Sequence, residues 1–249
     1  MPSLNHLSTE YLQRQRERVL ISLDQIVNDR ESKTGRSIPS ENSLRLNDGR
    51  RVAATVLFLD ICGFSDRYQC TETEQDRELK ALAVFFSEMV RVINDYGGVV
   101  EKNTGDGLMA YFEGVRSGEN GSPHKAVACA LTIFYTAAQI VNPVIAKAGL
   151  IPFEFRMCAD FGDVTIARLG SSRLFNGIVA IGSHVNSPAK MLSKAKGNQF
   201  LIGNDLAISL PRDWQNKFVN WLSPVNSTYN YRENGKPYPF YFYNGRWES

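Results

Sequence analysis

The segment VLFLDICGFSD, residues 56–66, decides the fold around it. It begins with four apolar residues, as a buried strand does, and then places the carboxylate of Asp60 where the core would continue. Gly63, Phe64 and Ser65 follow almost at once, and the small glycine would let backbone N–H groups approach a bound polyphosphate. The pattern predicts a central strand that ends at a polar site.

The rest of the chain alternates between strand and helix periodicity. The expected elements are strand 52–60, helix 74–98, hairpin 97–114, helix 124–148, strand 153–162, a further strand 162–170, helix 184–197, strand 199–203 and an aromatic-rich terminal strand 238–247. The order strand, helix, hairpin, helix, strand is the βαββαβ pattern of a ferredoxin-like core. The sequence therefore predicts an α+β fold with this core, extra C-terminal strands and an N-terminal helix.

The first 50 residues differ in pattern from the remainder of the chain. Ser8 and Thr9 can cap a helix over 8–28, where apolar residues recur at helical spacing. Residues 29–50 are polar and have little periodicity, which is typical of a linker, with a short pairing segment around 44–46. We expect a helix and linker over 1–50 and one domain over 51–249.

Composition excludes several classes of protein. The hydrophobic fraction of 43% supports a packed core, and 28 basic against 26 acidic residues give a net charge of only +2, without the excess of a nucleic-acid binder. The four cysteines form no CxxC pair, so we expect reduced thiols rather than a zinc site or disulfides. The N-terminus lacks the apolar core of a signal peptide, and the apolar run 53–59 is too short to span a bilayer. We expect a cytoplasmic protein that binds no membrane.

Two carboxylates suggest chemistry. In a ferredoxin-like sheet the first strand neighbours the hairpin, so Asp60 and Asp106 could meet at one edge. Together with the backbone carbonyl of Ile61 they would suit Mg²⁺ or Mn²⁺, which take oxygen ligands and leave room for substrate phosphates. Each aspartate alone also has a structural explanation, because Asp is common in hairpin turns and at helix N-caps. Taken together, they predict phosphoryl transfer.

These motifs resemble those of the class III nucleotidyl cyclases. FLDICGFS is similar to the family's first metal motif and EKNTGDGLMA to its hairpin motif. FRMCADFGDV is similar to the next strand and turn, and IGSHVNSPAKM to the helix that bears transition-state residues. The resemblance covers roughly residues 51–205 and keeps the order and spacing of the motifs, so it implies that 51–249 is a cyclase catalytic domain.

The resemblance implies a role for each matching residue. Asp60, Ile61 and Asp106 would hold two divalent ions, Mg²⁺ or Mn²⁺, and Asn186 would orient the ribose. Lys190 stands where the family usually has Arg, and supplies a charge to the α-phosphate without a planar fork, unless it is simply a solvated helix lysine. The implied triphosphate contacts are Ile61, Cys62, Gly63, Phe64, Ser65 and, in some family members, Arg156.

The base-reading positions depart from the adenylate cyclase pattern. Lys102 matches the family's purine-reading lysine, but its usual Asp partner is Val179, which cannot accept a hydrogen bond from the adenine amine. Uracil needs no such acceptor, and cytosine could find another. The chain therefore resembles the stand-alone pyrimidine cyclases of bacterial anti-phage (Pycsar) signalling, and the implied reaction is UTP to cUMP, or CTP to cCMP, with release of pyrophosphate. An adenylate or guanylate cyclase remains open.

The family assembles its sites between two chains. This chain contains both sets of residues, so the resemblance implies a homodimer with two composite sites, Asp60 and Asp106 from one protomer and Lys102, Asn186 and Lys190 from the other. The apolar stripe within 79–90 would then be core or dimer surface. The competing reading is a catalytically inactive nucleotide-binding dimer module, since Lys190 and Val179 both depart from the family pattern.

Overall fold

The computed structural model describes residues 6–28, 49–67, 71–103, 105–118, 120–171, 175–218, 222–225, 230 and 235–247. Its strands are β1 (Gly49–Ile61), β2 (Val99–Asn103), β3 (Gly107–Glu113), β4 (Phe155–Ser171), β5 (Phe175–Ile181), β6 (Phe200–Gly203), β7 (Leu222–Val225) and β8 (Phe240–Tyr243). Its α-helices are α1 (Thr9–Asn28), α2 (Glu72–Asp95), α3 (Ser122–Thr136), α4 (Asn142–Lys147), α5 (Ser183–Met191), α6 (Asn204–Ala207) and α7 (Arg212–Phe218). The pairing segment expected at 44–46 lies outside the described residues.

The predicted α+β fold is confirmed. β1, α2, β2, β3, α3 and β4 follow one another in the βαββαβ order, and the strands form a sheet in the order β2-β3-β1-β4-β6-β8-β7, with β5 paired to β4. β1 lies antiparallel between β3 and β4, which makes it the central strand that its apolar sequence predicts. The added strands β6 to β8 extend the sheet beyond β4.

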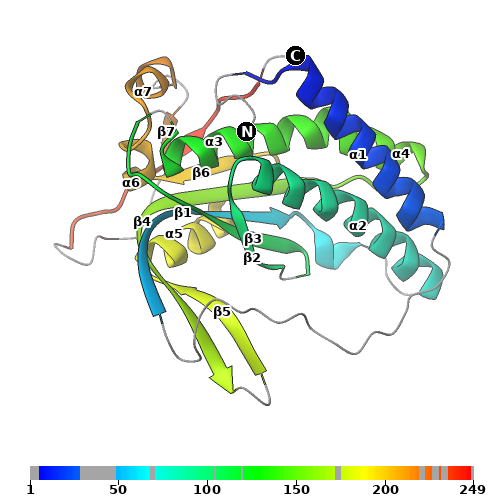
Figure 1. Ribbon diagram of the computed structural model, residues 1–249, viewed down its shortest axis with the longest axis horizontal. Coiled ribbons are helices and arrows are strands. Elements are labelled where there is room, and N and C mark those ends of the chain that lie inside the picture. The colour runs from blue at the N-terminus through cyan, green and yellow to red at the C-terminus, as the bar shows by residue number, and fades with distance from the viewer. Residues whose placement is uncertain are drawn as a thin grey trace.

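Alternation along β1 separates the two faces of the sheet. Leu57 and Leu59 are buried in the large core cluster that includes side chains of α2 and α3. Ala54 and Val56 point to the opposite face, where they pack with Val185 of α5. Figure 1 shows the same division, with α1 to α4 on one side of the sheet and α5 on the other. Because side chains alternate with a period of two, Asp60 belongs to the α5 face.

β4 corrects one prediction. The sequence was expected to form two strands that meet at Gly162, but 155–171 is one continuous strand of 17 residues. Gly162 stays in register opposite Ala54 of β1, so the ladder is not interrupted. A Cβ atom at Gly162 would lie 2.1 Å from the imidazole of His184, so the glycine makes room for a ring and does not end a strand. β5, which pairs with the second half of β4, was not predicted.

The helical run Ser122–Lys147 is long and apolar enough to cross a membrane by length and composition alone. Most of its side chains are buried against the sheet and helices of the same chain, as expected of a core helix. The run is continuous because a π-helical turn, Ala137–Val141, connects α3 to α4.

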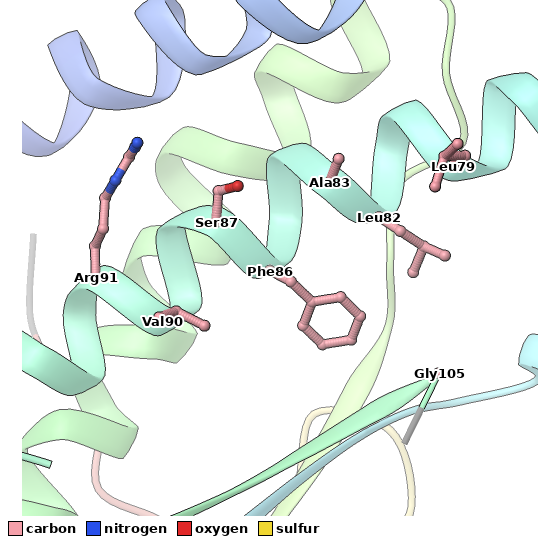
Figure 2. A pocket seen from close by; sticks show the side chains of 8 residues that line it. All are labelled: Leu79, Leu82, Ala83, Phe86, Ser87, Val90, Arg91 and Gly105. Atoms are coloured by element: carbon pink, nitrogen blue, oxygen red, sulfur yellow. The ribbon is translucent and has the colours of Figure 1, made fainter. Parts of the chain in front are cut away.

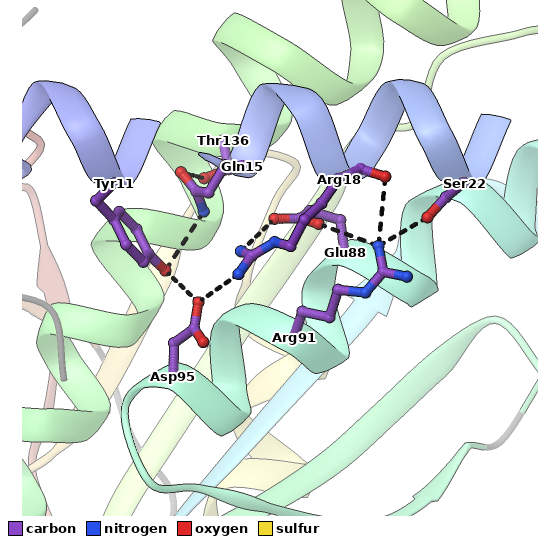
Figure 3. A network of polar contacts seen from close by, with 8 residues as sticks. All are labelled: Tyr11, Gln15, Arg18, Ser22, Glu88, Arg91, Asp95 and Thr136. Atoms are coloured by element: carbon purple, nitrogen blue, oxygen red, sulfur yellow. Dashed lines mark hydrogen bonds and ion pairs between the residues drawn. The ribbon is translucent and has the colours of Figure 1, made fainter. Parts of the chain in front are cut away.

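α1 is fixed to α2 by buried polar contacts (Figure 3). Tyr11 donates to Asp95 at 2.9 Å, and Arg18 contacts both Asp95 at 3.0 Å and Glu88 at 2.9 Å. The side chain of Glu88 is only 1% exposed, so its charge depends on these partners. The N-terminal helix therefore packs on the helical layer of the sheet.

The first and last described segments meet on α3. The hydroxyl of Thr136 donates to Gln15 of α1 at 3.2 Å, and the indole N–H of Trp247 donates to Thr132 at 3.0 Å. Thr132 and Thr136 are one helical turn apart and therefore lie on the same face of the helix.

Candidate active site

Strand pairing brings the two predicted metal ligands to one edge of the sheet. Asp60 lies opposite Gly107 in the β1–β3 ladder, and the N–H of Ile61 donates to the carbonyl of Asp106 at 2.8 Å. Asp60 and Asp106 are therefore neighbours across the two strands, although 45 residues of sequence lie between them. Both residues are partly exposed, which leaves them accessible to a ligand.

Arg156 lies directly beside Asp60. The two residues are paired across β1 and β4, and Nε and Nη2 of the guanidinium donate to Oδ2 of the carboxylate at 2.8 and 2.7 Å. Nη1 donates to the carbonyl of Ala195 at 3.0 Å, which ties the arginine to the turn after α5. The Arg156 side chain is 29% exposed and that of Asp60 is 22% exposed, so the pair can be reached from solvent.

The segment after Asp60 forms a tight turn. Gly63 has φ 63°, in the left-handed region that glycine adopts without strain, and a single 3₁₀ turn, Phe64–Asp66, follows it. The N–H of Cys62 donates to the carbonyl of Glu154 at 2.8 Å, and burial raises the pKa of the Cys62 thiol. α2 begins only at Glu72, so the described turn over 61–65 ends in a 3₁₀ turn and not in a long helix.

α5 carries the two predicted transition-state residues. Asn186 and Lys190 are four residues apart and exposed, so both project from one face of the helix into solvent. Pro188 lies between them inside the helix, and its side chain is buried with Val185 and Met191. The buried face of α5 thus rests on the sheet while the opposite face presents the amide and the ammonium group.

The two predicted base-reading positions lie close together. Lys102 pairs with Met109 of β3 after a bulge, and the bulge residue Glu101 accepts a hydrogen bond from the N–H of Ala180 at 3.2 Å. Val179, the residue before Ala180, is half-buried. This contact, between residues 79 apart in sequence, joins the neighbours of Lys102 and Val179 in space; the Lys102 side chain itself lies outside the described part of the chain.

An apolar groove of about 620 Å³ lies between α2 and the tip of the β2–β3 hairpin (Figure 2). It is lined by Leu79, Leu82, Ala83, Phe86, Ser87, Val90, Arg91 and Gly105. Gly105, the residue before Asp106, contributes the hairpin side of this lining. Leu79 is 56% exposed, so the stripe predicted over 79–90 is core on one side of α2 and open surface on the other.

A charged cluster beneath α5 was missed by the sequence analysis. Asp160 of β4 is completely buried, accepts hydrogen bonds from Tyr238 at 2.7 Å, and lies 3.2 Å from Nδ1 of His184 on α5. One sequence signal could have indicated this cluster: Asp160 lies within an otherwise apolar stretch, and a carboxylate that is buried there requires polar partners. The two partners lie 24 and 78 residues away, so no local pattern could identify them.

The residues at the sheet edge fit a divalent ion. Two carboxylates and one backbone carbonyl are hard oxygen donors of the kind that Mg²⁺ and Mn²⁺ prefer when substrate phosphates complete the coordination. Within the described residues, no group of three or more His, Cys, Asp or Glu side chains gathers, so a cage made of protein side chains alone is not found there. The donor set suits an ion shared with a triphosphate.

Comparison with known proteins agrees with these observations. No family model matches the chain. It is 31% identical to a uridylate cyclase from Burkholderia cepacia, over 64% of this chain and 68% of that protein. It is also 27% identical to a uridylate cyclase from Rhodovulum sp. (strain MB263), over 68% of this chain and 70% of that protein.

Solved structures share the fold. The guanylyl cyclase Cya2 has a TM-score of 0.63 and 24% identity over 81% of this chain and 95% of that one. The adenylyl cyclase CyaB from P. aeruginosa has a TM-score of 0.61 and 20% identity over 78% and 95%. The chain belongs to the uridylate cyclase family and is a nucleotidyl cyclase with the class III fold.

Proposed function

We propose that this cyclase converts UTP into 3′,5′-cyclic UMP and pyrophosphate. The observation that carries the proposal is the apposition of Asp60 and Asp106 at one sheet edge, in a chain that is 31% identical to a uridylate cyclase. In the reaction, a bond forms between O3′ of the ribose and the α-phosphorus. The bond from the α-phosphorus to the bridging oxygen breaks, pyrophosphate leaves with the electron pair, and the proton of the 3′-hydroxyl passes to solvent.

Asp60, Asp106 and the carbonyl of Ile61 would hold two ions, Mg²⁺ or Mn²⁺. When bound, these ions supply Lewis-acid chemistry that makes the 3′-hydroxyl a better nucleophile and offsets the charge of the triphosphate. Arg156, whose guanidinium lies against Asp60 in the single chain, would donate to a phosphate oxygen once an ion takes its place on that carboxylate. The N–H groups of Ile61 and Cys62 already donate to the carbonyls of Asp106 and Glu154, so the backbone N–H groups of 63–65 are the ones that would bind the β- and γ-phosphates.

Asn186 and Lys190 would act on the reacting centre. The amide of Asn186 can orient the ribose by hydrogen bonds, so that O3′ approaches the α-phosphate in line with the leaving group. The ammonium group of Lys190 can balance the charge that develops on the α-phosphate oxygens. Their exposure on one face of α5 supports roles toward a ligand that lies outside their own protomer's core.

Lys102 and Val179 would select the base. The ammonium group of Lys102 can donate to a carbonyl oxygen of uracil, and Val179 packs against the ring without offering an acceptor. Adenine and cytosine each carry an exocyclic amine that would then lose a hydrogen bond, which costs about 1–3 kcal/mol when the group is buried. The relatives' names favour UTP over CTP for the same site.

We propose that two copies form a homodimer with two composite sites. Asp60 and Asp106 of one protomer would face Lys102, Asn186 and Lys190 of the other. The open apolar groove beside the hairpin tip supports an interface at this edge, because it leaves Leu79 exposed in the single chain. A guanylyl cyclase domain from Blastocladiella emersonii whose structure is described as a non-canonical dimer shares the fold, with a TM-score of 0.60 and 20% identity.

The decisive experiment incubates the purified protein with Mn²⁺ and each of UTP, CTP, ATP and GTP, and identifies the products by mass spectrometry. We expect cyclic UMP from UTP, with the other three triphosphates converted at least 10-fold more slowly. Cyclic CMP as the main product would move the assignment to a cytidylate cyclase, and cyclic AMP or GMP would overturn the pyrimidine assignment. Binding without turnover of any nucleotide would indicate the inactive dimer module.

A second experiment tests the composite site. Asp106→Ala and Asn186→Ala each damage a different half, so a mixture of the two inactive variants should recover up to about a quarter of wild-type activity by forming one intact site per heterodimer. If heterodimers form and the mixture stays inactive, the two-chain site is wrong.

We propose the cytoplasm as the site of the reaction. The described cysteines, Cys62, Cys129 and Cys158, are free thiols, as a reducing compartment would maintain. The near-neutral charge supports a small-molecule substrate over nucleic acid. A role in anti-phage signalling is proposed from the resemblance alone. Phage infection of cells that carry the wild-type protein, compared with cells that carry the Asp106→Ala variant, tests it.

A further inference from the structure

His184 is held between two carboxylates at the start of α5. Its Nδ1 lies 3.2 Å from Oδ2 of Asp160, and its Nε2 lies 3.9 Å from Oδ2 of Asp205 on α6. The hydroxyl of Tyr238 donates to both oxygens of Asp160 at 2.7 Å and accepts from the N–H of Asp205 at 3.2 Å. The N–H of Phe161 donates to Oδ1 of Asp160 at 2.9 Å. These contacts connect α5, β4, α6 and the C-terminal segment.

The backbone is shaped to admit this cluster. A Cβ atom at Gly162 would lie 2.1 Å from Cδ2 and 2.3 Å from Nε2 of His184. A Cβ atom at Gly203 would lie 2.3 Å from Oδ1 of Asp160 and 2.7 Å from the hydroxyl of Tyr238. Real Cβ atoms do not approach other atoms this closely, so both glycines are needed for the ring and the carboxylate to fit. The cluster is a built feature of the sheet and not a chance contact of surface groups.

The charges around His184 favour its imidazolium form. Burial of the ring favours the neutral form, but the hydrogen bond to Asp160 and the charges of Asp160, Asp205 and Asp163 outweigh it and raise the pKa of His184. A charged His184 can donate from Nδ1 to Asp160, and its Nε2 faces the carboxylate of Asp205 on α6 at ion-pair distance. Asp160 is completely buried, so the imidazolium is also the cation that compensates its charge.

His184 fixes the first turn of α5, in addition to the buried side chains of Val185, Pro188 and Met191. The helix has nine residues, Gly182 provides no side-chain cap at its N-terminus, and Pro188 lies inside it. His184 is the second residue of the helix, two positions before Asn186 and six before Lys190. A shift of this first turn would move both exposed groups relative to the partner's triphosphate, and small misplacements of reacting groups cost large factors in rate.

We propose that His184, clamped by Asp160 and Asp205, is a positioning residue that sets the place of Asn186 and Lys190 in the transition state. The proposal rests on the proposed function, because it assigns a role toward the reaction of that site. His184 touches no reacting atom in it, and acts through the helix. The proposed metal-binding contacts at Asp60 and Asp106 lie in the other half of the composite site.

The test compares His184→Gln with the wild-type homodimer. We expect kcat for cyclic UMP formation to fall about 10–100-fold, as for a displacement of the reacting groups by a fraction of an ångström to about 1 Å. KM for UTP and the affinity for Mn²⁺, measured by electron paramagnetic resonance, should change less than threefold. His124→Gln is the matched control, because His124 is a buried histidine on α3 whose loss should affect stability and leave kcat within twofold.

Two further measurements separate positioning from simple loss of stability. Asp160→Asn keeps the shape of the side chain but removes the charge that holds the imidazolium. As the pH rises, kcat should therefore decline with a midpoint at a lower pH in this variant than in wild type. Asp160, Asp163, Asp205 and Tyr238 are the titratable groups that face the ring, and Tyr238→Phe should leave this pH midpoint closer to that of wild type. ¹⁵N NMR of the His184 ring reports its protonation without any turnover.

The outcomes are distinct. A wild-type protein that cyclises no nucleotide overturns the proposed function, whereas an active wild type with unchanged kcat in His184→Gln overturns only the positioning role. Equal loss of kcat in His184→Gln and His124→Gln would also overturn it, because both would then act through stability. A His184 ring that titrates in the NMR spectrum no higher than an unperturbed histidine would contradict the clamp.

Discussion

The sharpest prediction on stability concerns Arg18, which joins α1 to the body of the protein. Its guanidinium lies 2.9 Å from Glu88, whose side chain is 1% exposed, and 3.0 Å from Asp95 (Figure 3). Arg18→Met would leave a buried carboxylate without its nearest cation, a change that costs about 3–5 kcal/mol when the pair is fully buried. Arg91 remains 3.7 Å from Glu88, and Arg18 itself is 29% exposed. Both effects reduce the expected loss to about 2–3 kcal/mol.

Urea unfolding measured by circular dichroism gives the free energy directly, and a loss of this size should also lower Tm by about 4–10 °C for a chain of this length. Arg16→Met is the matched control, since Arg16 is exposed on the same helix and should change stability by less than about 0.5 kcal/mol. Adding Glu88→Leu to Arg18→Met should restore much of the loss, because the double change removes the stranded charge.

The effect should depend on pH with a definite sign. Burial raises the pKa of Glu88 even with Arg18 present, and loss of Arg18 removes the main opposing interactions. An acid whose folded pKa is raised is destabilising above that pKa, and this cost is relieved as the pH falls through it, because the folded state then takes up the proton. The deficit of Arg18→Met should therefore shrink from pH 8 toward pH 5. A variant as stable as Arg16→Met at pH 8, or a deficit that grows in acid, would refute the reasoning.

Three further predictions concern the sheet. Asp60→Ala should abolish cyclic nucleotide formation while the circular dichroism spectrum and Tm stay close to wild type, and undiminished turnover would contradict the metal assignment. Arg156→Met should lower kcat/KM for UTP at least 100-fold through lost phosphate contacts. The same change frees Asp60 from a cation, so the affinity for Mn²⁺, measured by calorimetry without nucleotide, should not weaken. Weaker Mn²⁺ binding would count against this view. Gly162→Ala should cost about 1–3 kcal/mol in urea unfolding, because its methyl group would displace the ring of His184.

The fold was predictable because its signals are local. Local patterns predict a strand before Asp60, a helix at α2 and a hairpin around Asp106. The order of these elements identifies the core. The prediction that a strand ends at Gly162 was wrong. Glycine often weakens or interrupts a strand, but here it makes room for the side chain of His184, 22 residues later in the sequence. Tertiary contacts override local signals in this way where a ring or a ligand needs room.

Some contacts of the candidate site could be predicted from the sequence and others could not. Asp60 and Asp106 could be paired from the sequence because hairpin and strand are neighbours in this topology. The pairing of Arg156 with Asp60 spans 96 residues and depends on the register of β1 and β4, which no sequence pattern specifies residue by residue. The same register places Asp160 in the interior, where it requires the distant Tyr238.

The meeting of the first and last described segments on α3 has a practical consequence. Gln15 and Trp247 are held by Thr136 and Thr132, on the helical side of the sheet and away from α5 (Figure 1). A reporter protein fused to either end would sit on that side and leave the surface that presents Asn186 free for a second protomer.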